Sequence, residues 1–381
     1  MSLIFLDNAA TTPLEPRVKE EMTRMMENFG NPSSTHLNGR SAKVEVELVR
    51  KRIAKTIGAM PSEIFFTSGG TEADNMSLFC SVRDLDVKRI ITTPIEHHAV
   101  GHPVEFMSER GEIEAAYLNV NEYGDIDLEE LELLLKEGPK TLVSLMFANN
   151  EIGNFNPVKD ISDLCRQYDA LFHSDTVQAM GHLPINVVDT KYDFLTCSAH
   201  KIHGPKGVGF VYVRSNLKIK PLIQGGAQER NMRAGTENTI GICGLGKAFE
   251  LAIDGMAEDQ RKVEELKKYI IKEVQLIVPG VKFFGRSGEL DKSLYTVLNI
   301  AFPKLNNEML TFALDIKGIN VSGGSACNSG SSQGSHVIRA LGSWTANYQP
   351  VRVSMSKFNT KACADGFLNA VREIYNTKVE C

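Results

Sequence analysis

The fold is decided by Ile64-Phe65-Phe66-Thr67-Ser68-Gly69-Gly70-Thr71-Glu72. Its first four residues are apolar or β-branched and predict a short buried strand, the glycines predict a turn, and the last two residues begin a helix. Such a turn leaves N–H groups at the helix start, where the helix dipole also favours an anion. The stretch therefore predicts an α/β protein with a phosphate site here, although the same strand, turn and helix also occur without a ligand.

Strand-like and helix-like runs alternate on both sides of this stretch. The alternation is typical of a mainly parallel sheet that helices cover on both faces. We expect strands at Arg89–Thr93, Thr141–Ala148, Leu171–Asp175, Phe194–Ser198 and Val208–Arg214, and helices at Asn38–Gly58, Thr71–Arg83 and Pro157–Tyr168. Open sheets of this type bind ligands at the carboxyl ends of their strands, so we expect a site there.

The later part of the chain predicts a second, smaller domain. A charged segment, Met256–Lys272, predicts a long helix at the change of domain. Beyond it we expect strands at Leu294–Phe302 and Val351–Ser354, and a closing helix at Thr360–Tyr375.

A lysine follows the predicted strand at 194–198, in Ser198-Ala199-His200-Lys201-Ile202-His203-Gly204-Pro205. A lysine on such a loop can hold an aldehyde cofactor covalently. Pyridoxal phosphate also requires an acid beside its pyridinium nitrogen, a phosphate cradle and a group that covers its ring. The chain offers a candidate for each requirement, and the order of these candidates favours a site for this cofactor.

The candidates lie near predicted strand ends. Asp175 ends one strand, and an ionised carboxylate there would keep the ring nitrogen protonated. Gln178, three residues later, is placed to reach the ring hydroxyl. The candidate phosphate donors are Gly70, Thr71, Ser198 and His200. Taken singly, each residue has an ordinary explanation, because loop lysines are usually solvated and an aspartate after a strand often caps a helix.

Serine and glycine make up most of residues 322–335, SGGSACNSGSSQGS. This composition predicts a flexible loop. Cys327 lies within it, and a thiol on an accessible polar loop is placed to react as a thiolate. A linker that happens to contain a cysteine is the alternative interpretation.

Composition and charge limit the class of protein. The 381 residues suffice for one large and one smaller domain. A net charge of −5 gives no indication of nucleic-acid binding. The seven cysteines are scattered and lack CxxC spacing, which indicates reduced thiols in a cytoplasm. We find no signal peptide and no apolar run of about 20 residues, so we expect a soluble cytoplasmic protein without membrane contact.

Metal and nucleotide sites have little support. His98 and His102 are spaced to share a helix face next to His97, but no HExxH motif or cysteine cluster accompanies them, so we predict no metal. The glycines at 204–209 enter a predicted strand instead of leaving one, which is the wrong order for a dinucleotide-binding turn, and no Walker lysine motif occurs.

Motifs along nearly the whole chain carry a family resemblance. In order, they are LDNAATTP (6–13), NPSS (31–34), TSGGTE (67–72), EH (96–97), NNEIG (149–153), DTVQ (175–178), the Lys201 stretch, QER (228–230), RAGTEN (233–238) and SAC (325–327). With this ordered set the chain resembles the class V, fold-type I pyridoxal-phosphate enzymes, and among them the cysteine desulfurases of the NifS and IscS type.

The resemblance implies a fold and a division into domains. The fold is α/β, of the fold-type I transferase kind, with a large domain built on a mainly parallel seven-stranded sheet between helices and a smaller α+β domain. We expect residues 14–256 to form the large cofactor-binding domain. Residues 1–13 and 257–381 would form the small domain, which carries the catalytic cysteine loop 322–335.

The resemblance also implies residue roles. Lys201 would hold the cofactor and then move the α-proton of the substrate, His97 would lie over the ring, and Cys327 would take the sulfur. The implied cofactor-binding residues are Gly70, Thr71, His97, Asn150, Asp175, Gln178, Ser198, His200, Lys201 and Thr236, the last reaching the phosphate of the neighbouring subunit. The implied substrate-binding residues are Asn8, Asn150 and Arg352, where Arg352 offers two parallel N–H donors to a carboxylate.

The implied activity is that of a pyridoxal-phosphate-dependent L-cysteine desulfurase, which forms L-alanine and leaves the sulfur on Cys327 as a persulfide. The expected partners are L-cysteine, a second copy of the chain, and a sulfur acceptor or iron–sulfur scaffold protein. The sulfur would serve iron–sulfur cluster assembly, tRNA thiolation or thiamine synthesis. Two alternatives stay open: a lyase acting on selenocysteine or cysteine sulfinate, and a noncatalytic sulfur-relay or scaffold protein.

Overall fold

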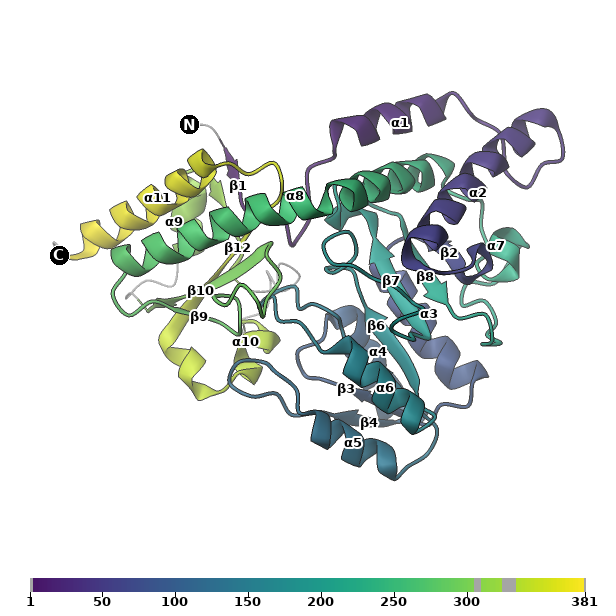
Figure 1. The fold of residues 1–381 in the computed structure, drawn as a ribbon, viewed down its shortest axis with the longest axis horizontal. Helices are drawn as coiled ribbons and strands as arrows, with labels where there is room; N and C mark the ends of the chain where they lie inside the picture. Colours follow the sequence, from purple (N-terminus) through teal and green to yellow (C-terminus); the bar gives the residue numbers. More distant parts are fainter. Residues whose placement is uncertain (1–2, 305–309, 324–333, 380–381) are drawn as a thin grey trace.

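The computed structural model describes residues 3–304, 310–323 and 334–379 (Figure 1). The strands are β1 (Ile4–Phe5), β2 (Ile64–Thr67), β3 (Arg89–Thr92), β4 (Glu114–Tyr117), β5 (Thr141–Ser144), β6 (Leu171–Asp175), β7 (Phe194–Ser198), β8 (Gly209–Val213), β9 (Lys282–Phe283), β10 (Val297–Pro303), β11 (Ile319–Asn320) and β12 (Tyr348–Ser354). The α-helices are α1 (Pro16–Met26), α2 (Leu37–Ile57), α3 (Gly70–Asp84), α4 (His98–Glu109), α5 (Leu128–Lys136), α6 (Val158–Gln167), α7 (Gln228–Asn231), α8 (Thr239–Ile277), α9 (Leu310–Ile316), α10 (His336–Ala340) and α11 (Lys361–Val379). Short 3-10 turns include η1 (Pro61–Glu63), η2 (Ala199–Lys201) and η4 (Ser343–Asn347).

A seven-stranded sheet forms the centre of the larger part of the molecule, in the order β2-β8-β7-β6-β5-β3-β4. Strand β8 is antiparallel to both of its neighbours, and the other pairs are parallel. Strands β5 to β8 are buried along their whole length, as continuous apolar runs predict for a sheet covered on both faces. The predicted α/β fold with a mainly parallel sheet is confirmed.

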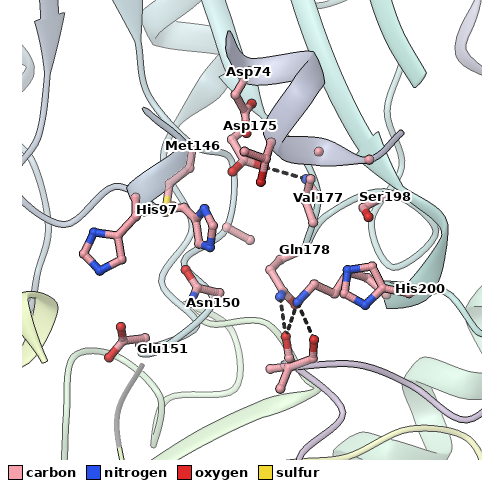
Figure 2. Close-up of a pocket in the computed structure, with 18 of the residues that line it drawn as sticks. Asp74, His97, Met146, Asn150, Glu151, Asp175, Val177, Gln178, Ser198 and His200 are labelled. Atoms are coloured by element: carbon pink, nitrogen blue, oxygen red, sulfur yellow. Dashed lines mark hydrogen bonds between the residues drawn. The ribbon is translucent and has the colours of Figure 1, made fainter. Parts of the chain in front are cut away.

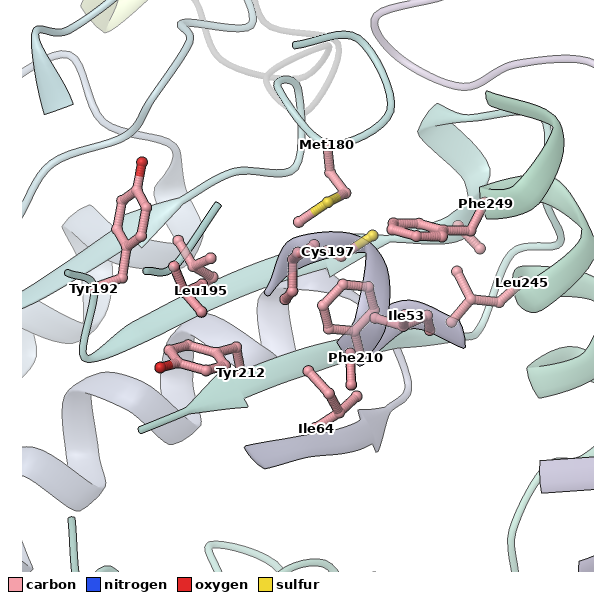
Figure 3. Packing of buried hydrophobic residues seen from close by; sticks show 14 of the residues in the cluster. Ile53, Ile64, Met180, Tyr192, Leu195, Cys197, Phe210, Tyr212, Leu245 and Phe249 are labelled. Atoms are coloured by element: carbon pink, nitrogen blue, oxygen red, sulfur yellow. The ribbon is translucent and has the colours of Figure 1, made fainter. Parts of the chain in front are cut away.

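Helices cover both faces of this sheet. Helix α2 buries Ala42, Val46, Val49, Ile53 and Ile57 at helical spacing, and Gly58, in a left-handed conformation with φ 75°, ends it. The face that α2 covers also packs against Phe249 of α8, which contacts Phe210 of the sheet (Figure 3). Helices α3 and α4 pack on the opposite face.

One helix of 39 residues, α8, connects the large sheet with a smaller unit (Figure 1). Residues 242–251 belong to the core on the large sheet, and residues 263–274 belong to the core of the smaller unit. That unit contains the antiparallel sheet β12-β10-β9 and the parallel pair β1 and β11. The change of core within α8 supports the proposed domain boundary at residue 256, and β1 supports the assignment of residues 1–13 to the small domain.

Several elements differ from the sequence expectations. β10 begins three residues later than expected and β12 three residues earlier. The helix expected at 256–272 begins earlier, at Thr239. Its first half contains glycines that serve packing, since a Cβ on Gly246 would lie 2.6 Å from Val49 of α2. The strand expected to reach Ala148 is regular only to Ser144. The N–H groups of Leu145 and Phe147 still donate to the carbonyl oxygens of His173 and Asp175 in β6, and the chain then turns at Asn149, whose Oδ1 accepts two backbone N–H groups. No helix within the described ranges has both the length and the apolar character needed to cross a membrane.

Candidate active site

A cavity of about 420 Å³ lies at the carboxyl ends of the large sheet's strands (Figure 2). Its walls come from the ends of β6 and β7, the start of α3 and the segments that follow β3 and β5. Arg352 of β12 and His336 of α10 close it on the side of the smaller unit. The volume is typical of small-molecule sites, and the position is the one that open α/β sheets favour.

Lys201 ends the turn η2, directly after β7. Its Nζ donates hydrogen bonds to the carbonyl oxygens of Ala9 at 2.6 Å and Ala10 at 2.9 Å. Gln178 donates from Nε2 to the same Ala9 oxygen at 3.0 Å (Figure 2). The N-terminal segment therefore forms one wall of the cavity and orients both side chains.

Asp175, the last residue of β6, places a buried carboxyl group in the cavity wall. Its Oδ1 accepts a hydrogen bond from the N–H of Val177 at 2.8 Å. Burial and, to a smaller extent, the charge of Asp74 raise the pKa of Asp175 to about 7, while the N–H of Val177 and the charge of Lys201 act in the opposite direction. A cation placed against this carboxyl would favour its ionised form.

The start of α3 faces the same cavity, where Gly70 and Thr71 line it together with Ser198 and His200. Gly69 has φ 153°, a backbone conformation that glycine adopts most readily. The first N–H groups of a helix lack intrahelical partners, so they are available to an anion. Burial lowers the pKa of His200 to about 4, and its ring is therefore neutral at pH 7.

His97 is the N-cap of α4 at the edge of the cavity. Its Nδ1 accepts a hydrogen bond from the N–H of Ala99 at 3.1 Å, so the proton of the neutral ring is on Nε2. Burial, with a further effect of Lys201, lowers the pKa of His97 to about 4. The residue therefore offers an N–H donor, without charge, at neutral pH.

Arg352 enters the cavity from β12 and is 1 % exposed. Its Nη2 lies 2.8 Å from Oδ1 of Asp7, and its Nη1 donates to the carbonyl oxygen of Asn150 at 3.1 Å. The same Asp7 oxygen accepts a hydrogen bond from the Ser322 hydroxyl at 3.0 Å. Nε of Arg352 has no hydrogen-bond partner among the residues described. The guanidinium is thus oriented by Asp7 and by the carbonyl group of Asn150 in the cavity wall.

Two of the predicted site residues that the structure describes are not part of this cavity wall. Asn8 is buried, donates from Nδ2 to the Ser354 carbonyl oxygen at 2.8 Å and anchors the N-terminal segment to β12, so the lining residues do not include it. Thr236 is exposed and lines a separate, smaller hollow. Cys327 lies outside the described residues.

The histidines that were considered as metal ligands have rings that contact one another. The rings of His98 and His102 lie 4.4 Å apart, and His98 is as close to His336. In the part of the chain that the structure describes, metal-binding atoms converge only at Glu21, Glu45 and Cys243, where Arg24 already pairs with both glutamates.

A family model described as Aminotransferase class-V matches residues 4–367. The chain belongs to the aminotransferase class-V family. Among curated proteins of similar sequence, a cysteine desulfurase IscS of Dictyoglomus turgidum is 45% identical over 342 residues, which cover 89% of this chain and 85% of that protein. Enzymes of the class-V family generally use pyridoxal phosphate.

Solved structures of similar fold agree with the class-V assignment. A NifS-like protein superposes with a TM-score of 0.91 at 36% identity, over 99% of this chain and 100% of that one. A structure described as SspA in complex with cysteine has a TM-score of 0.81 at 31% identity, over 93% of this chain and 99% of that one.

The donor set of the cavity fits the cofactor of the class-V family. A primary amine, a buried carboxyl group and a helix start with hydroxyl and imidazole donors lie in one cavity. A Cβ on Gly70 would lie 2.6 Å from Val177 Cγ2, so a side chain at this turn would disturb the segment that follows Asp175. Amine, acid and anion cradle together are what pyridoxal phosphate requires.

Sequence reasoning missed several residues of the site, namely Asp74, Met146, Glu151 and His336. Asp74 is 1 % exposed, in the first turns of α3. Its spacing from Ser77 and Ser81, both buried, places it on a face of small residues that packs on the sheet. That spacing was the signal available in the sequence.

Proposed function

We propose that this class-V family member is a pyridoxal-phosphate-dependent cysteine desulfurase. L-Cysteine and the thiol of Cys327 would give L-alanine and an enzyme persulfide. The Cβ–S bond of the substrate breaks, an S–S bond to Cys327 forms, and the proton of the enzyme thiol balances the new C–H bond of alanine. The convergence of Lys201, Asp175 and Arg352 in one cavity carries the proposal.

Lys201, Asp175, Gln178 and His97 would hold the cofactor, with its phosphate at the start of α3 beside Ser198 and His200. When bound, the cofactor withdraws electrons from the α-carbon of the substrate. An ionised Asp175 would stabilise a protonated ring nitrogen, and the Nε2–H group of His97 would donate a hydrogen bond without adding charge.

The remaining roles belong to side chains that bind the substrate or move protons. Arg352 would bind the substrate carboxylate, with Asn150 beside it and Asp7 orienting the guanidinium. Lys201 would take the α-proton, because its amine lies inside the cavity. A wrongly placed carboxylate would move the α-carbon away from this amine, so the Arg352 contact determines which bond is presented to the base.

Cys327 would attack the substrate sulfur as a thiolate. The described residues that flank its segment support this role. Ser322 donates to Asp7, the partner of Arg352. Ser335 donates to Oε2 of Glu151 at 2.6 Å, and Glu151 lines the cavity. Both flanking residues are therefore tied to groups beside the proposed substrate position.

We also propose a cytoplasmic homodimer in which Thr236 contacts the cofactor phosphate of the neighbouring subunit, and a sulfur acceptor or scaffold protein that removes the persulfide. The exposure of Thr236, away from its own chain's cavity, supports the shared site. Sedimentation velocity should give twice the chain mass of 42.1 kDa. A monomer with full cofactor occupancy would count against the dimer.

The test of the activity is release of L-alanine and sulfide from L-cysteine and a thiol reductant. Wild type should release equal amounts of both. Cys327→Ala should lose sulfide release and keep the visible absorbance of the cofactor, because Lys201 and the cavity are unchanged. Cys363→Ala, which removes the one thiol that is not buried among the described residues, should behave as wild type.

Each other outcome has a defined meaning. Undiminished sulfide release by Cys327→Ala would refute the role of this thiol. A coloured wild type that is inert toward L-cysteine but active on selenocysteine or cysteine sulfinate would identify the related lyase. A purified protein that takes up no cofactor would favour a noncatalytic scaffold.

A further inference from the structure

A second buried aspartate lies directly beside Asp175 in the cavity wall (Figure 2). Asp74 comes from α3 and is 1 % exposed, and Asp175 comes from β6 and is 7 % exposed. Burial raises the pKa of each carboxyl group to about 7. Two carboxylates that share a site away from water repel each other, so one of them retains a proton near neutral pH.

Asp74 contacts the ring of His173, which in turn contacts Ser144. Nε2 of His173 lies 3.3 Å from Oδ1 of Asp74, and its Nδ1 lies 2.8 Å from the Ser144 hydroxyl. Both His173 and Ser144 are completely buried. Burial lowers the pKa of His173 to about 4, so at pH 7 the neutral ring has one N–H group and one bare nitrogen. The unprotonated nitrogen can accept a hydrogen bond from a protonated carboxyl group.

The surroundings of Asp175 favour its charged form. It accepts the N–H group of Val177 at 2.8 Å, and the nearby Lys201 favours a negative charge. Hydrogen bonds and positive charges of this kind stabilise a carboxylate over a carboxylic acid.

The surroundings of Asp74 favour its neutral form. Its Oδ1 makes no regular hydrogen bond to any described residue, and neither does the Nε2 of His173 that faces it. The hydroxyl of Thr196 lowers the pKa of Asp74 but makes no hydrogen bond of regular geometry. The other titratable groups near the pair are Glu96 and Cys197, whose pKa values burial raises. Neither residue can supply a positive charge.

We propose that Asp74 is a positioning residue that holds the proton of this pair, so that Asp175 alone carries the negative charge. Asp74 donates its O–H group to Nε2 of His173, and Nδ1–H of His173 donates to the Ser144 hydroxyl. The consequence for catalysis, one fixed carboxylate against the ring nitrogen of the cofactor, rests on the proposed function. The assignment of the proton to Asp74 does not depend on the proposed function.

Infrared spectroscopy of the holoenzyme tests where the proton is. Free aspartate has a pKa of about 3.9, so a protonated aspartate at neutral pH is abnormal and gives a separate C=O stretch. Wild type that contains carboxyl-labelled 13C-aspartate should show this band shifted relative to unlabelled enzyme. Asp74→Asn should abolish the band, and Glu96→Gln, which removes another buried carboxyl of the region, should leave the aspartate band in place.

The same spectra can overturn the assignment. Absence of the isotope-shifted band in wild type would do so without any variant, so the test survives even if a variant fails to fold. A band that persists in Asp74→Asn and disappears in Asp175→Asn would place the proton on Asp175 and contradict the assignment to Asp74. An enzyme inert toward L-cysteine still gives these spectra, which keeps a failure of the proposed function distinct from a failure of this assignment.

A pH titration of the visible cofactor absorbance separates an electrostatic role from a purely structural one. In wild type, loss of the Asp74 proton at alkaline pH adds a second charge beside Asp175 and should shift the absorbance. Asp74→Asn is uncharged and close in shape to the protonated acid, so it should keep the neutral-pH spectrum and lose the alkaline shift. An unchanged alkaline shift in Asp74→Asn would contradict the proposal.

Discussion

At the scale of single residues, the candidate site consists of polar groups that already have partners within the chain. Lys201 is oriented by the carbonyl groups of residues 9 and 10, and Arg352 by Asp7. Groups held in this way lose little freedom when a ligand arrives. The binding of substrate therefore depends on the shape of each donor as well as on its charge.

Arg352→Lys tests this dependence. Lysine keeps the positive charge but lacks the planar fork that contacts Asp7 and Asn150 together. We expect KM for L-cysteine to rise about tenfold, equivalent to about 1.4 kcal/mol, with a smaller change in kcat, as measured by steady-state kinetics. Arg372→Lys, on the exposed face of α11, should change neither constant. A lower kcat at unchanged KM would argue against a carboxylate-binding role.

The sequence predicts individual residues well where their position is set by a strand end. Asp175 and Lys201 each follow an apolar run whose end is unambiguous, and both line the cavity. Asp74 could not be predicted in this way, because an aspartate in a helix usually faces water and only packing reverses that preference. Cys327 lies on a segment outside the described residues, so its role stays a prediction.

At the scale of elements, the strands and helices next to the site were predicted most closely, and the bounds of α3 differ from the expected ones by a single residue at each end. β6 and β7 have the bounds expected from their apolar runs. The first half of α8 was hidden because Gly244 and Gly246 lower helix propensity, although both allow close packing against α1 and α2. Packing between elements, which a single sequence does not display, determined the true length of this helix.

A pair of glycine substitutions separates packing from propensity. Gly246→Ala should lower the free energy of unfolding, because its Cβ would lie 2.6 Å from Val49 and overpacking costs about 1–3 kcal/mol. Gly101→Ala, in α4, meets nothing within 4 Å and should raise the free energy of unfolding by about 0.5–1 kcal/mol. Urea unfolding measures both, and two changes of the same sign would show that packing is not the cause.

At the scale of the whole molecule, a buried lysine connects the small unit to the cavity. Lys267 of α8 is completely buried, and its Nζ donates to the Ser293 hydroxyl at 2.8 Å and the Leu294 carbonyl oxygen at 2.9 Å. The N–H of Leu294 donates to Gly153 at 2.7 Å, in the turn that carries Asn150. Burial lowers the pKa of Lys267 to about 7.

This low pKa predicts a dependence of stability on pH. An unfolded lysine has a pKa of about 10.4, so between pH 7 and that value the unfolded chain binds more protons, and the free energy of unfolding rises with pH. Between pH 7 and pH 9, the free energy of unfolding of wild type should rise by about 2 kcal/mol relative to that of Lys267→Met, as measured by urea titration. Lys268→Met, which changes the exposed neighbour, should show the same pH dependence of the free energy of unfolding as wild type. If Lys267→Met also kept this dependence, Lys267 would be excluded as its origin.

The pairing of the chain's first segment with its last strands has a consequence for biosynthesis. β1 pairs with β11, and Asn8 and Ala9 bond to Ser354 of β12. A nascent chain can assemble the large sheet once Val213 has left the ribosome, since domains fold as they emerge. Contacts with His200 already hold this segment against the large sheet, but those with Ser354 form only after residue 354 has been translated. The full set of contacts that orients Lys201, and with it cofactor capture, is therefore completed late in the maturation of this protein, after its main sheet.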